Sequence, residues 1–435
     1  MNKKITRSEE NLDFIEDRRF VYSSIGKIPK DWEIVTLDEI AEITSSKRIY
    51  AKDYTSKGIP FYRSKEIIEK AKKKEIKDTI YISKEKFLEL KNKFGVPSKG
   101  DLLITAVGTL GVPYLVDDDE EFYFKDGNLI WMRNIKSVDK KFLYFYWNSL
   151  IMKKQIDSIF NGSSQKALSI VRVNKLQIPK PDLKEQQKIA DILSTWDRAI
   201  ELKEKLIDQK KQMKKGLMQK LLTGEVRLPG FDGEWEEIKL GNIGYTYNGL
   251  SGKTKKDFGE GKPYIPYKTI FDDYKVDTSK LDFVKIDPDE KQNKVKYGDV
   301  LFTASSETPD EVGMSSVFLD NDISEIYLNS FCFGFRLNDF NTILPEFAQY
   351  LYRSSDFRRK TYSLAQGSTR FNLSKKELLK VKVKAPSLKE QKAVSKILDS
   401  IKKEIFLLEK EVSYLRLQKK GLMQLLLTGK VRVKV

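Results

Sequence analysis

The chain has 435 residues, 40% hydrophobic and 33% charged, which is the composition of a globular protein with room for about three domains. It has no histidine and a single cysteine, Cys332, which excludes histidine-dependent catalysis, histidine-ligated metals, intramolecular disulfides and multi-cysteine zinc sites. Its 80 Lys and Arg against 63 Asp and Glu give a net charge of +17, which favours a polyanionic partner such as nucleic acid.

Residues 1–27 are charged throughout and lack the apolar stretch of a signal peptide. No later run of the sequence approaches the length of apolar residues that a membrane span requires. We therefore expect a cytoplasmic protein with no membrane partner, and we treat residues 1–27 as an N-terminal extension without an assigned role.

Residues 28–180 are predicted to form a compact α+β domain. Short β-rich runs such as LLITAV, from Leu102, and NLIWMR, from Asn128, are separated by Gly, Asp and Asn turns and by charged helical stretches. The length of this segment is close to the commonest domain size.

Residues 181–227 are predicted to form one long helix. Asp182 and Glu185 stand three residues apart just after Pro181, which is the spacing of a capping box at a helix start. Gly224 follows the last apolar turn, where a left-handed residue is favoured. Such a helix of about 40 residues extends about 60 Å, which is too long for an ordinary globular helix.

The same order of segments then repeats. Residues 228–385 contain the β-rich runs VLFTAS and FCFGFRL and are predicted to form a second α+β domain. Residues 386–435 are predicted to form a second long helix. In this helix Ser387 and Glu390 repeat the capping-box spacing, and Gly429 repeats the C-terminal glycine.

An internal duplication explains this alternation. LKEQQKIADIL at 183–193 recurs as LKEQKAVSKIL at 388–398, and KKGLMQKLLTGEVR at 214–227 recurs as KKGLMQLLLTGKVR at 419–432. Both pairs share an offset of 205 residues, as expected of a continuous rigid element. Weaker echoes in the globular segments, such as KGDLLIT with YGDVLFT, keep their order but not their spacing, as expected of variable loops on a common scaffold.

Apolar residues at alternating steps of three and four give each long helix one stripe, which is typical of a coiled-coil seam. The seam positions are Ile189, Leu193, Trp196, Ile200, Ile207, Leu217, Leu221, Val394, Leu398, Ile401, Ile405, Leu408, Val412, Leu415, Leu422 and Leu426. Lysines interrupt both stripes; they are Lys203, Lys210, Lys214 and Lys419. We expect Leu206 and Met213 to turn inward and cover part of the gap in the first stripe.

A helix with a single apolar stripe needs a partner, and the chain supplies one in its other repeat. We therefore predict an α+β fold in which two similar globular domains alternate with two long helices. The helices are expected to pair as an antiparallel intramolecular coiled coil with pseudo-two-fold symmetry. The alternative is that each helix packs only on its own globular domain.

Basic, aromatic and hydroxyl residues in loops of the globular segments are candidate DNA contacts, because such side chains reach phosphates and base edges. They are Lys47, Arg48, Arg63, Lys65, Ser163, Ser164, Gln165, Lys166, Lys253, Lys255, Tyr267, Lys268, Ser368, Thr369 and Arg370. Two simpler interpretations stay open. Charge runs are often solvated surface, and Ser169 and Ser374, at the ends of the repeated motifs GSSQKALS and GSTRFNLS, suit helix N-caps. We predict no catalytic or metal-binding residue.

Three features together resemble the specificity subunit of type I restriction-modification systems. They are the duplicated Pro-x-Leu-x-Glu-Gln helix starts at Pro181 and Pro386, the duplicated GLMQ-to-LLTG helix ends, and Trp32 and Trp235 at the opening of each globular segment. The resemblance covers residues 28–435. It implies that each globular segment is a target-recognition domain for one half of an asymmetric bipartite DNA site, with the helices as a spacer between the halves.

The resemblance also implies a non-catalytic subunit that binds double-stranded DNA and scaffolds two methyltransferase subunits and the restriction-translocase subunits. S-adenosylmethionine, and ATP with Mg, would then bind to those partners and not to this chain. Two alternatives stay open. One is a single-chain DNA methyltransferase or nuclease with its own reader domains, and the other is a coiled-coil interaction protein without a nucleic-acid role.

Overall fold

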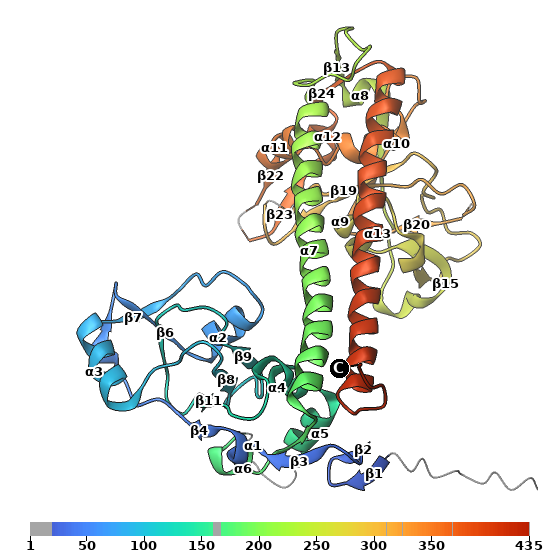
Figure 1. The fold of residues 1–435 in the computed structure, drawn as a ribbon. Helices are drawn as coiled ribbons and strands as arrows, with labels where there is room; N and C mark the ends of the chain where they lie inside the picture. Colours follow the sequence, from blue (N-terminus) through green and yellow to red (C-terminus); the bar gives the residue numbers. More distant parts are fainter. Residues whose placement is uncertain (1–19, 160–166, 310, 324, 368, 435) are drawn as a thin grey trace, which may run out of the picture. The chain divides into compact units, whose positions relative to one another are not determined.

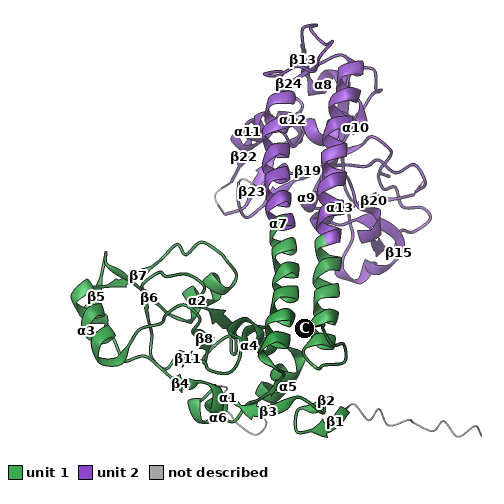
Figure 2. Ribbon diagram, viewed as in Figure 1, with its two compact units in different colours: residues 1–202, 412–435 green, residues 203–411 purple. Residues whose placement is uncertain are grey.

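A computed structural model describes residues 20–159, 167–309, 311–323, 325–367 and 369–434. The chain divides into two compact units, unit 1 with residues 1–202 and 412–435 and unit 2 with residues 203–411 (Figure 2). Each unit holds one globular domain and part of each of two long helices, α7 (Leu183–Leu221) and α13 (Leu388–Leu426). Both helices therefore contribute to both units.

The globular domain of unit 1 is built on two four-stranded sheets, in the orders β4-β11-β8-β9 and β10-β6-β7-β5. Neighbouring strands within both sheets are antiparallel, except for β10 and β6, which are parallel. The strands are β1 (Phe20–Ser23), β2 (Gly26–Pro29), β3 (Glu33–Thr36), β4 (Glu42–Thr44), β5 (Tyr54–Thr55), β6 (Ile59–Tyr62), β7 (Ile80–Ile82), β8 (Leu102–Thr105), β9 (Pro113–Leu115), β10 (Tyr123–Phe124), β11 (Leu129–Arg133) and β12 (Gln177–Lys180). All of β8 and nearly all of β11 is buried, because side chains cover both faces of their sheet.

Short helices complete this domain. They are α1 (Leu37–Ile40), the 3-10 helix η1 (Ala51–Asp53), α2 (Ser64–Ala71), α3 (Lys84–Phe94), α4 (Lys140–Trp147), α5 (Leu150–Ile159) and α6 (Ile170–Asn174). Ser83, Asp139 and Ser169 cap α3, α4 and α6 by accepting a hydrogen bond from a backbone N–H of the first turn. Part of the N-terminal extension forms the hairpin of β1 and β2.

The globular domain of unit 2 repeats this plan. Its sheet β14-β21-β17-β19 corresponds to β4-β11-β8-β9, and its sheet β16-β15-β20 to β7-β6-β10, including the parallel pair of β15 and β20. A further sheet has the order β18-β23-β22. The strands are β13 (Glu236–Lys239), β14 (Gly244–Asn248), β15 (Phe258–Ile265), β16 (Asp282–Val284), β17 (Val300–Thr303), β18 (Ser305–Ser306), β19 (Ser315–Val317), β20 (Tyr327–Leu328), β21 (Cys332–Leu337), β22 (Ala365–Gln366), β23 (Phe371–Leu373) and β24 (Lys382–Ala385).

The short helices of unit 2 follow the order of unit 1 except that unit 1 has α3 after β7, whereas unit 2 has the 3-10 helix η3 before β16. They are α8 (Leu240–Ile243), the 3-10 helix η2 (Lys255–Asp257), α9 (Tyr267–Asp272), the 3-10 helix η3 (Thr278–Lys280), α10 (Pro345–Leu351), α11 (Ser355–Ser363) and α12 (Lys375–Leu378). In unit 2 the Gln391 side chain of α13 accepts a hydrogen bond from the Leu344 N–H ahead of α10 at 2.9 Å. In unit 1 Gln186 of α7 accepts the equivalent bond from the Asp139 N–H ahead of α4 at 2.7 Å.

In each unit the last strand of the globular domain pairs with a strand near its start, which in unit 1 is the strand after the β1–β2 hairpin. β3 pairs antiparallel with β12, and β13 pairs antiparallel with β24. Each domain therefore begins and ends at neighbouring points, immediately before the long helix that follows it in the chain.

Within each unit, the segments of the two long helices lie side by side and run antiparallel (Figure 1). In unit 1 the start of α7 shares a hydrophobic core with the end of α13, through Leu193 and Leu426. In unit 2 the end of α7 shares a core with the start of α13, through Leu221 and Leu398. The predicted fold class is confirmed: α+β domains alternate with two long helices that pair within the chain.

The predicted seam positions lie inward on both helices. The buried ones are Ile189, Leu193, Ile200, Ile207, Leu221, Val394, Leu398, Ile401, Ile405, Val412 and Leu426, and the half-buried ones are Trp196, Leu217, Leu408, Leu415 and Leu422. The expectation for Leu206 and Met213 was wrong, because these side chains are 37% and 43% exposed. Lys203 and Lys210 instead keep their seam positions and pair with carboxylates of α13.

Ion pairs accommodate Lys203, Lys210 and Lys419 in the seam. In unit 2 Lys203 pairs with Glu411 and Lys210 with Glu404, both at 2.8 Å. In unit 1 Lys419 of α13 pairs with Asp197 of α7 at 2.5 Å. The lysine stems thus cover apolar surface while their ammonium groups reach an acidic side chain at the edge of the seam.

The repeated motifs at the start and end of the long helices meet in unit 1. Arg432, beyond the end of α13, donates two hydrogen bonds to Glu185 at the start of α7, at 2.7 and 2.8 Å. Its guanidinium lies 5.7 Å from the ring centroid of Trp32, whose Nε1–H donates to Glu185 at 3.2 Å. Arg432 also binds Asp31 at 2.7 Å. We call this contact, and its equivalent in unit 2, the helix-end clasp.

Unit 2 repeats the helix-end clasp with other residues. Arg227 donates to both carboxylate oxygens of Glu390 at 2.7 Å and lies 5.8 Å from the ring centroid of Trp235. Of the two hydrogen bonds in each predicted capping box, the structure shows the one that the first residue accepts. Asp182 and Ser387 do accept from the N–H of the third residue. The two glutamate carboxylates, however, face the arginines, because burial at 1% and 2% exposure demands a counter-charge.

Within the part of the chain that the structure describes, no helix combines the length and the apolarity that crossing a membrane requires.

Candidate nucleic-acid interface

Five loops of unit 1 meet where β4, β6, β8 and β10 end and β11 begins. Four hydrogen bonds join them, at 2.8 to 3.0 Å: from Ser45 Oγ to Leu129 O, from Lys125 N to Tyr62 O, from Ala106 N to Asn128 O, and from Leu168 N to Ala106 O. We call residues 45–50, 63–65, 106–111, 125–128 and 167–169 the unit 1 loop cluster. Because it is anchored to strand ends, its side chains are presented by a rigid sheet.

Unit 2 has an equivalent cluster where β14, β15, β17 and β20 end and β21 begins. The corresponding bonds, at 2.9 to 3.2 Å, run from Gly249 N to Cys332 O, from Asn329 N to Ile265 O, from Ala304 N to Phe331 O, and from Leu373 N to Ala304 O. We call residues 249–254, 266–268, 304–309, 329–331 and 369–373 the unit 2 loop cluster. The same backbone scaffold thus carries two different sets of side chains.

Three predicted contacts of unit 1 are exposed cations in its loop cluster. Lys47 and Arg48 follow β4, and Lys65 lies in the first turn of α2. The Lys47 ammonium lies 5.1 Å from the ring centroid of Phe94. Arg48 pairs with Asp126 at 2.9 Å, yet 66% of its side chain is exposed. These groups can reach a phosphate without breaking a buried contact.

Arg63 has an internal role instead. It precedes α2 and donates to Glu66 at 2.6 Å, and Glu66 is only 1% exposed. Although burial acts to raise it, hydrogen bonds from Arg63 hold the pKa of Glu66 below its usual range, so the carboxylate stays ionised. The Arg63 guanidinium therefore fixes the loop, and we leave it out of the DNA-contact surface.

Lys253 in unit 2 is also engaged within the protein. It forms an ion pair with Glu290, and only 7% of its side chain is exposed. Lys255, at the start of η2, is exposed but lies just outside the loop cluster. The sequence could not separate the two lysines, because Glu290 is distant along the chain.

Tyr267 and Lys268 open α9 within the unit 2 loop cluster. The Tyr267 hydroxyl donates to Ser305 O at 3.1 Å, which ties α9 to the neighbouring loop. Burial raises the pKa of Tyr267, so its hydroxyl remains a proton donor. Lys268 is exposed.

The repeated Gly-Ser motifs contribute the fifth loop of each cluster. Ser163, Ser164, Gln165, Lys166 and Ser368 lie outside the described residues. Thr369 and Arg370 are exposed, and the Arg370 guanidinium lies 5.3 Å from the ring centroid of Phe331. Ser169 and Ser374 are N-caps of α6 and α12, which confirms the capping interpretation for these two serines.

Phe331 is a candidate contact that the sequence did not reveal. It shares its alternation phase with Phe333 and Phe335, which are buried in β21, so the pattern predicts a buried strand residue. The strand instead begins one residue later. The Phe331 N–H bonds the Asn329 side chain at 2.9 Å in the preceding turn, and Phe331 is 53% exposed. Its ring beside Arg370 offers a stacking face for a nucleotide.

A family model described as the type I restriction modification DNA specificity domain matches the chain twice, at residues 29–212 and at 232–413. The chain belongs to this family. Each match begins near the first strand of a globular domain of the specificity subunit and runs into the long helix that follows it. The duplication found in the sequence is therefore a duplication of the family's own domain.

Known proteins similar to this specificity subunit agree with that assignment. It is 29% identical over 450 residues to the type I restriction enzyme MjaVIII specificity subunit of Methanocaldococcus jannaschii, covering 97% of this chain and 98% of the relative. A chain in a solved structure on complex assembly and conformational transition of the type I R-M system matches with TM-score 0.60 and 19% identity, covering 93% and 99%. The HsdS subunit from Thermoanaerobacter tengcongensis matches with TM-score 0.51 and 20% identity, covering 93% and 98%. At these identities the structural matches show a shared fold.

Proposed function

We propose that this specificity subunit directs a type I restriction-modification complex to an asymmetric, two-part DNA site. Each loop cluster binds one half of the site, and the paired long helices hold the two clusters at a set spacing. The observation that carries the proposal is the presence of two loop clusters with equivalent backbone junctions and different side chains. A shared scaffold suits the same type of ligand, and different side chains suit different base sequences.

The exposed cations support duplex DNA as the ligand. Lys47, Arg48 and Lys65 in unit 1, and Lys268 and Arg370 in unit 2, are exposed within the clusters. Neutralising phosphates with such groups releases counterions, so binding weakens steeply as salt is raised. Replacing Lys47 and Arg48 together by Ala should weaken binding for every DNA sequence and reduce the salt slope. Lys253→Ala should leave the salt slope of DNA binding unchanged, because the Lys253 side chain is only 7% exposed and pairs with Glu290 inside the protein.

The methyl-transfer and cleavage reactions belong, in this proposal, to partner subunits. S-adenosylmethionine binds the methyltransferase subunits, and ATP with Mg binds the restriction-translocase subunits, while this chain binds no cofactor. Membership of the specificity family and the absence of histidine from the sequence support this division of labour.

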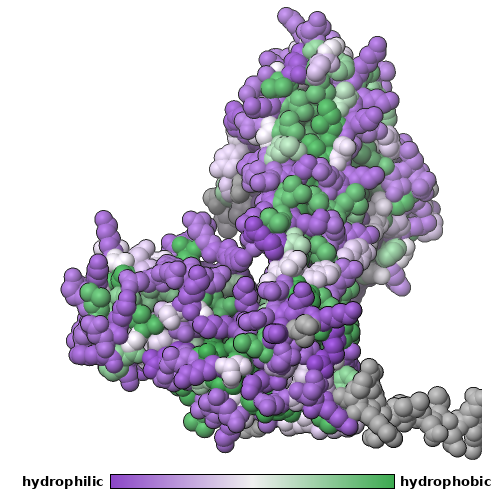
Figure 3. All heavy atoms as spheres, viewed as in Figure 1, coloured by the Kyte–Doolittle hydropathy of each residue, from purple (hydrophilic) through white to green (hydrophobic). Residues whose placement is uncertain are grey.

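Exposed apolar side chains on the long helices support a scaffolding role. They lie off the seam and are Leu202, Tyr414 and Leu417 in unit 1 and Leu206, Met213, Phe406 and Leu407 in unit 2. Apolar patches interrupt the hydrophilic surface along the long helices on the face shown in Figure 3. We propose that these helix faces bind two methyltransferase subunits. Phe406→Glu or Leu417→Glu should abolish co-purification with a methyltransferase subunit, and Lys403→Glu, on the exposed side of α13, should not.

Co-expression with a cognate methyltransferase subunit, followed by genome-wide mapping of N6-methyladenine, tests the function. We expect methylation at one asymmetric motif with two defined halves and a constant gap. The isolated chain, incubated with S-adenosylmethionine and the same DNA, should transfer no methyl group. Methylation by the isolated chain, or a single undivided motif, would contradict the proposal.

A further inference from the structure

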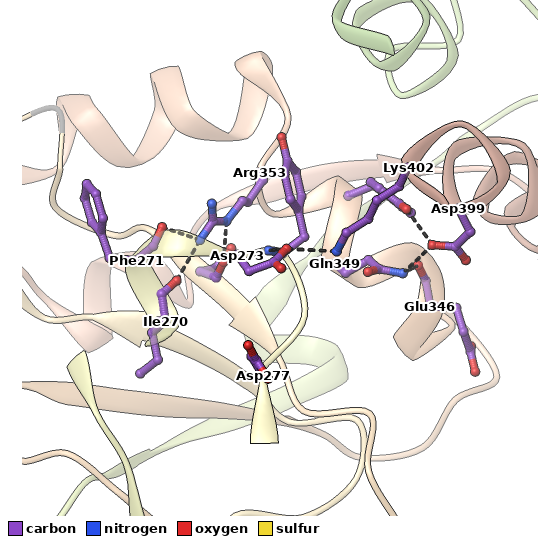
Figure 4. A network of polar contacts seen from close by, with 12 residues as sticks. Ile270, Phe271, Asp273, Asp277, Glu346, Gln349, Arg353, Asp399 and Lys402 are labelled. Carbon is purple, nitrogen blue, oxygen red and sulfur yellow. Dashed lines mark hydrogen bonds and ion pairs between the residues drawn. The ribbon is translucent and has the colours of Figure 1, made fainter. Parts of the chain in front are cut away.

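The turn that follows the short helix α2 in unit 1, and α9 in unit 2, contacts a long helix. In unit 2 Asp273, directly after α9, pairs with Lys402 of α13 at 2.8 Å (Figure 4). In unit 1 Lys73, just after α2, pairs with Glu201 of α7 at 2.6 Å. Equivalent turns therefore carry opposite charges, and each meets the opposite charge on its long helix.

Two lysines of the helix pair of unit 2 lie near Asp273, together with Asp399 of α13, whose carboxylate accepts a hydrogen bond from the Tyr350 hydroxyl. Lys214 of α7 is half-buried there, and burial together with the nearby Lys402 lowers the pKa of Lys214. Its ammonium lies 4.7 Å from the ring centroid of Tyr274, the residue after Asp273. The globular domain thus supplies a carboxylate and an aromatic face to two neighbouring lysines.

At the corresponding positions in unit 1, the charges of the two long helices balance each other. The offset of 205 residues equates Asp197 with Lys402 and Lys419 with Lys214. Asp197 and Lys419 bind each other at 2.5 Å, so the two helices neutralise each other there. Helix positions that are equivalent by sequence therefore have a carboxylate in unit 1 where unit 2 has a cation.

The end of α9, just before Asp273, is held by its own domain. The half-buried Arg353 donates to the carbonyl oxygens of Ile270 and Phe271, at 2.6 and 2.8 Å, and so fixes the end of α9 (Figure 4). The same guanidinium donates to Ser315 O at 2.5 Å, which anchors it to β19. The backbone that carries Asp273 is therefore anchored, which keeps its carboxylate within reach of Lys402.

We propose that these two turns are docking keys that assign each globular domain to its own place on the helix pair. A domain with a cation after this helix pairs with Glu201 and is repelled by Lys402 and Lys214. A domain with a carboxylate there has the reverse preference. Charge opposition of this kind separates two otherwise similar docking sites by penalising the wrong pairing.

Charge exchange in the full chain tests the proposal. Asp273→Lys gives the second domain the charge type of Lys73, and Lys402→Asp gives α13 the residue of the equivalent position in α7. Each single change should lower the melting temperature by roughly 2–4 °C and speed amide exchange in α9. The combination should restore both, because the opposite charges face each other again.

Lys403→Asp is the matched control, since Lys403 is the exposed neighbour of Lys402 on α13. Combined with Asp273→Lys, it should give no recovery. If Asp273→Lys fails to fold, recovery of soluble protein by Lys402→Asp supports the docking key. The proposal is overturned if Asp273→Lys changes neither melting nor exchange, or if Lys402→Asp rescues no better than Lys403→Asp.

Discussion

Glu185 and Glu390 are almost fully buried, and an arginine provides the counter-charge of each in the helix-end clasp. A buried carboxylate that loses its partner retains its desolvation cost, so breaking such a pair costs more than an exposed pair contributes. Arg432 and Arg227 are partly exposed, with 42% and 26% of their side chains accessible, which moderates that cost.

Arg432→Ala should therefore destabilise unit 1 by about 2 kcal/mol, and Arg227→Ala should destabilise unit 2. The loss should be larger for Arg227→Ala, because Glu185 keeps the indole hydrogen bond of Trp32, whereas the Trp235 Nε1–H has no hydrogen-bond partner among the described residues. Urea unfolding gives the loss, and amide exchange shows which unit opens. Arg→Lys controls should lose less, since charge is kept but the two-pronged geometry is not.

Glu66 gives unit 1 a predictable acid sensitivity. Its pKa in the folded protein lies below the ordinary value of 4.5, because hydrogen bonds from Arg63 outweigh burial. The stabilisation is therefore fully present above pH 4.5 and is lost as the pH falls through the lower folded value. Glu66→Gln should flatten this part of the stability curve, measured by urea unfolding at neutral pH and below pH 4.5. An unchanged acid limb would contradict the assignment.

Individual contacts were the hardest feature to predict from sequence. Glu66 is three residues from Arg63, so that pair was accessible in principle, whereas Glu290 is far from Lys253 along the chain. Phe331 fits the alternation of buried residues in β21, but the turn at Asn329 keeps it outside that strand. Such contacts depend on which loops pack against each other, and a single sequence does not show this.

The long helices are the elements that the sequence predicted best. Their 39-residue lengths and their apolar stripes followed from two ungapped repeats. What periodicity could not show was how the seam tolerates lysine. Lys210 keeps its seam position because Glu404 on α13 is opposite to it, so no rotation of the helix toward Met213 occurs.

Lys210→Leu should stabilise the helix pair by about 1 kcal/mol. The lysine side chain is 26% exposed, and a leucine there would bury apolar surface against the seam, whereas the partly exposed pair with Glu404 contributes little. Lys211→Leu is the control, because Lys211 is 52% exposed and lies off the seam. A thermal melt of each full-length variant gives the answer; equal gains for both would show that burial in the seam is not the cause.

At the scale of the whole molecule, the antiparallel pairing makes helix length a geometric parameter of the proposed DNA site. One heptad inserted into both helices adds about 10 Å to the pair, which is about three base pairs of B-DNA. The methylated motif should then keep both half-sequences and gain about three base pairs in its gap. Sequencing of N6-methyladenine sites measures this directly, and an unchanged gap would contradict the spacer role.

The sequence predicted the order of domains and helices and the antiparallel pairing, because duplication and periodicity report on whole segments. It did not reveal that each compact unit combines a domain with parts of both helices, nor the opposite charges of Lys73 and Asp273. These features arise from contacts between segments that are distant along the chain.

The pairing of an early strand with the last strand of each globular domain, β3 with β12 and β13 with β24, bears on how the gene can recombine. Because each globular domain leaves the scaffold and returns to it at adjacent points, the gene segment that encodes everything between those strands can be replaced by recombination as one cassette. A single crossover tract would then change one half of the proposed DNA site, while the rest of the chain is inherited unchanged.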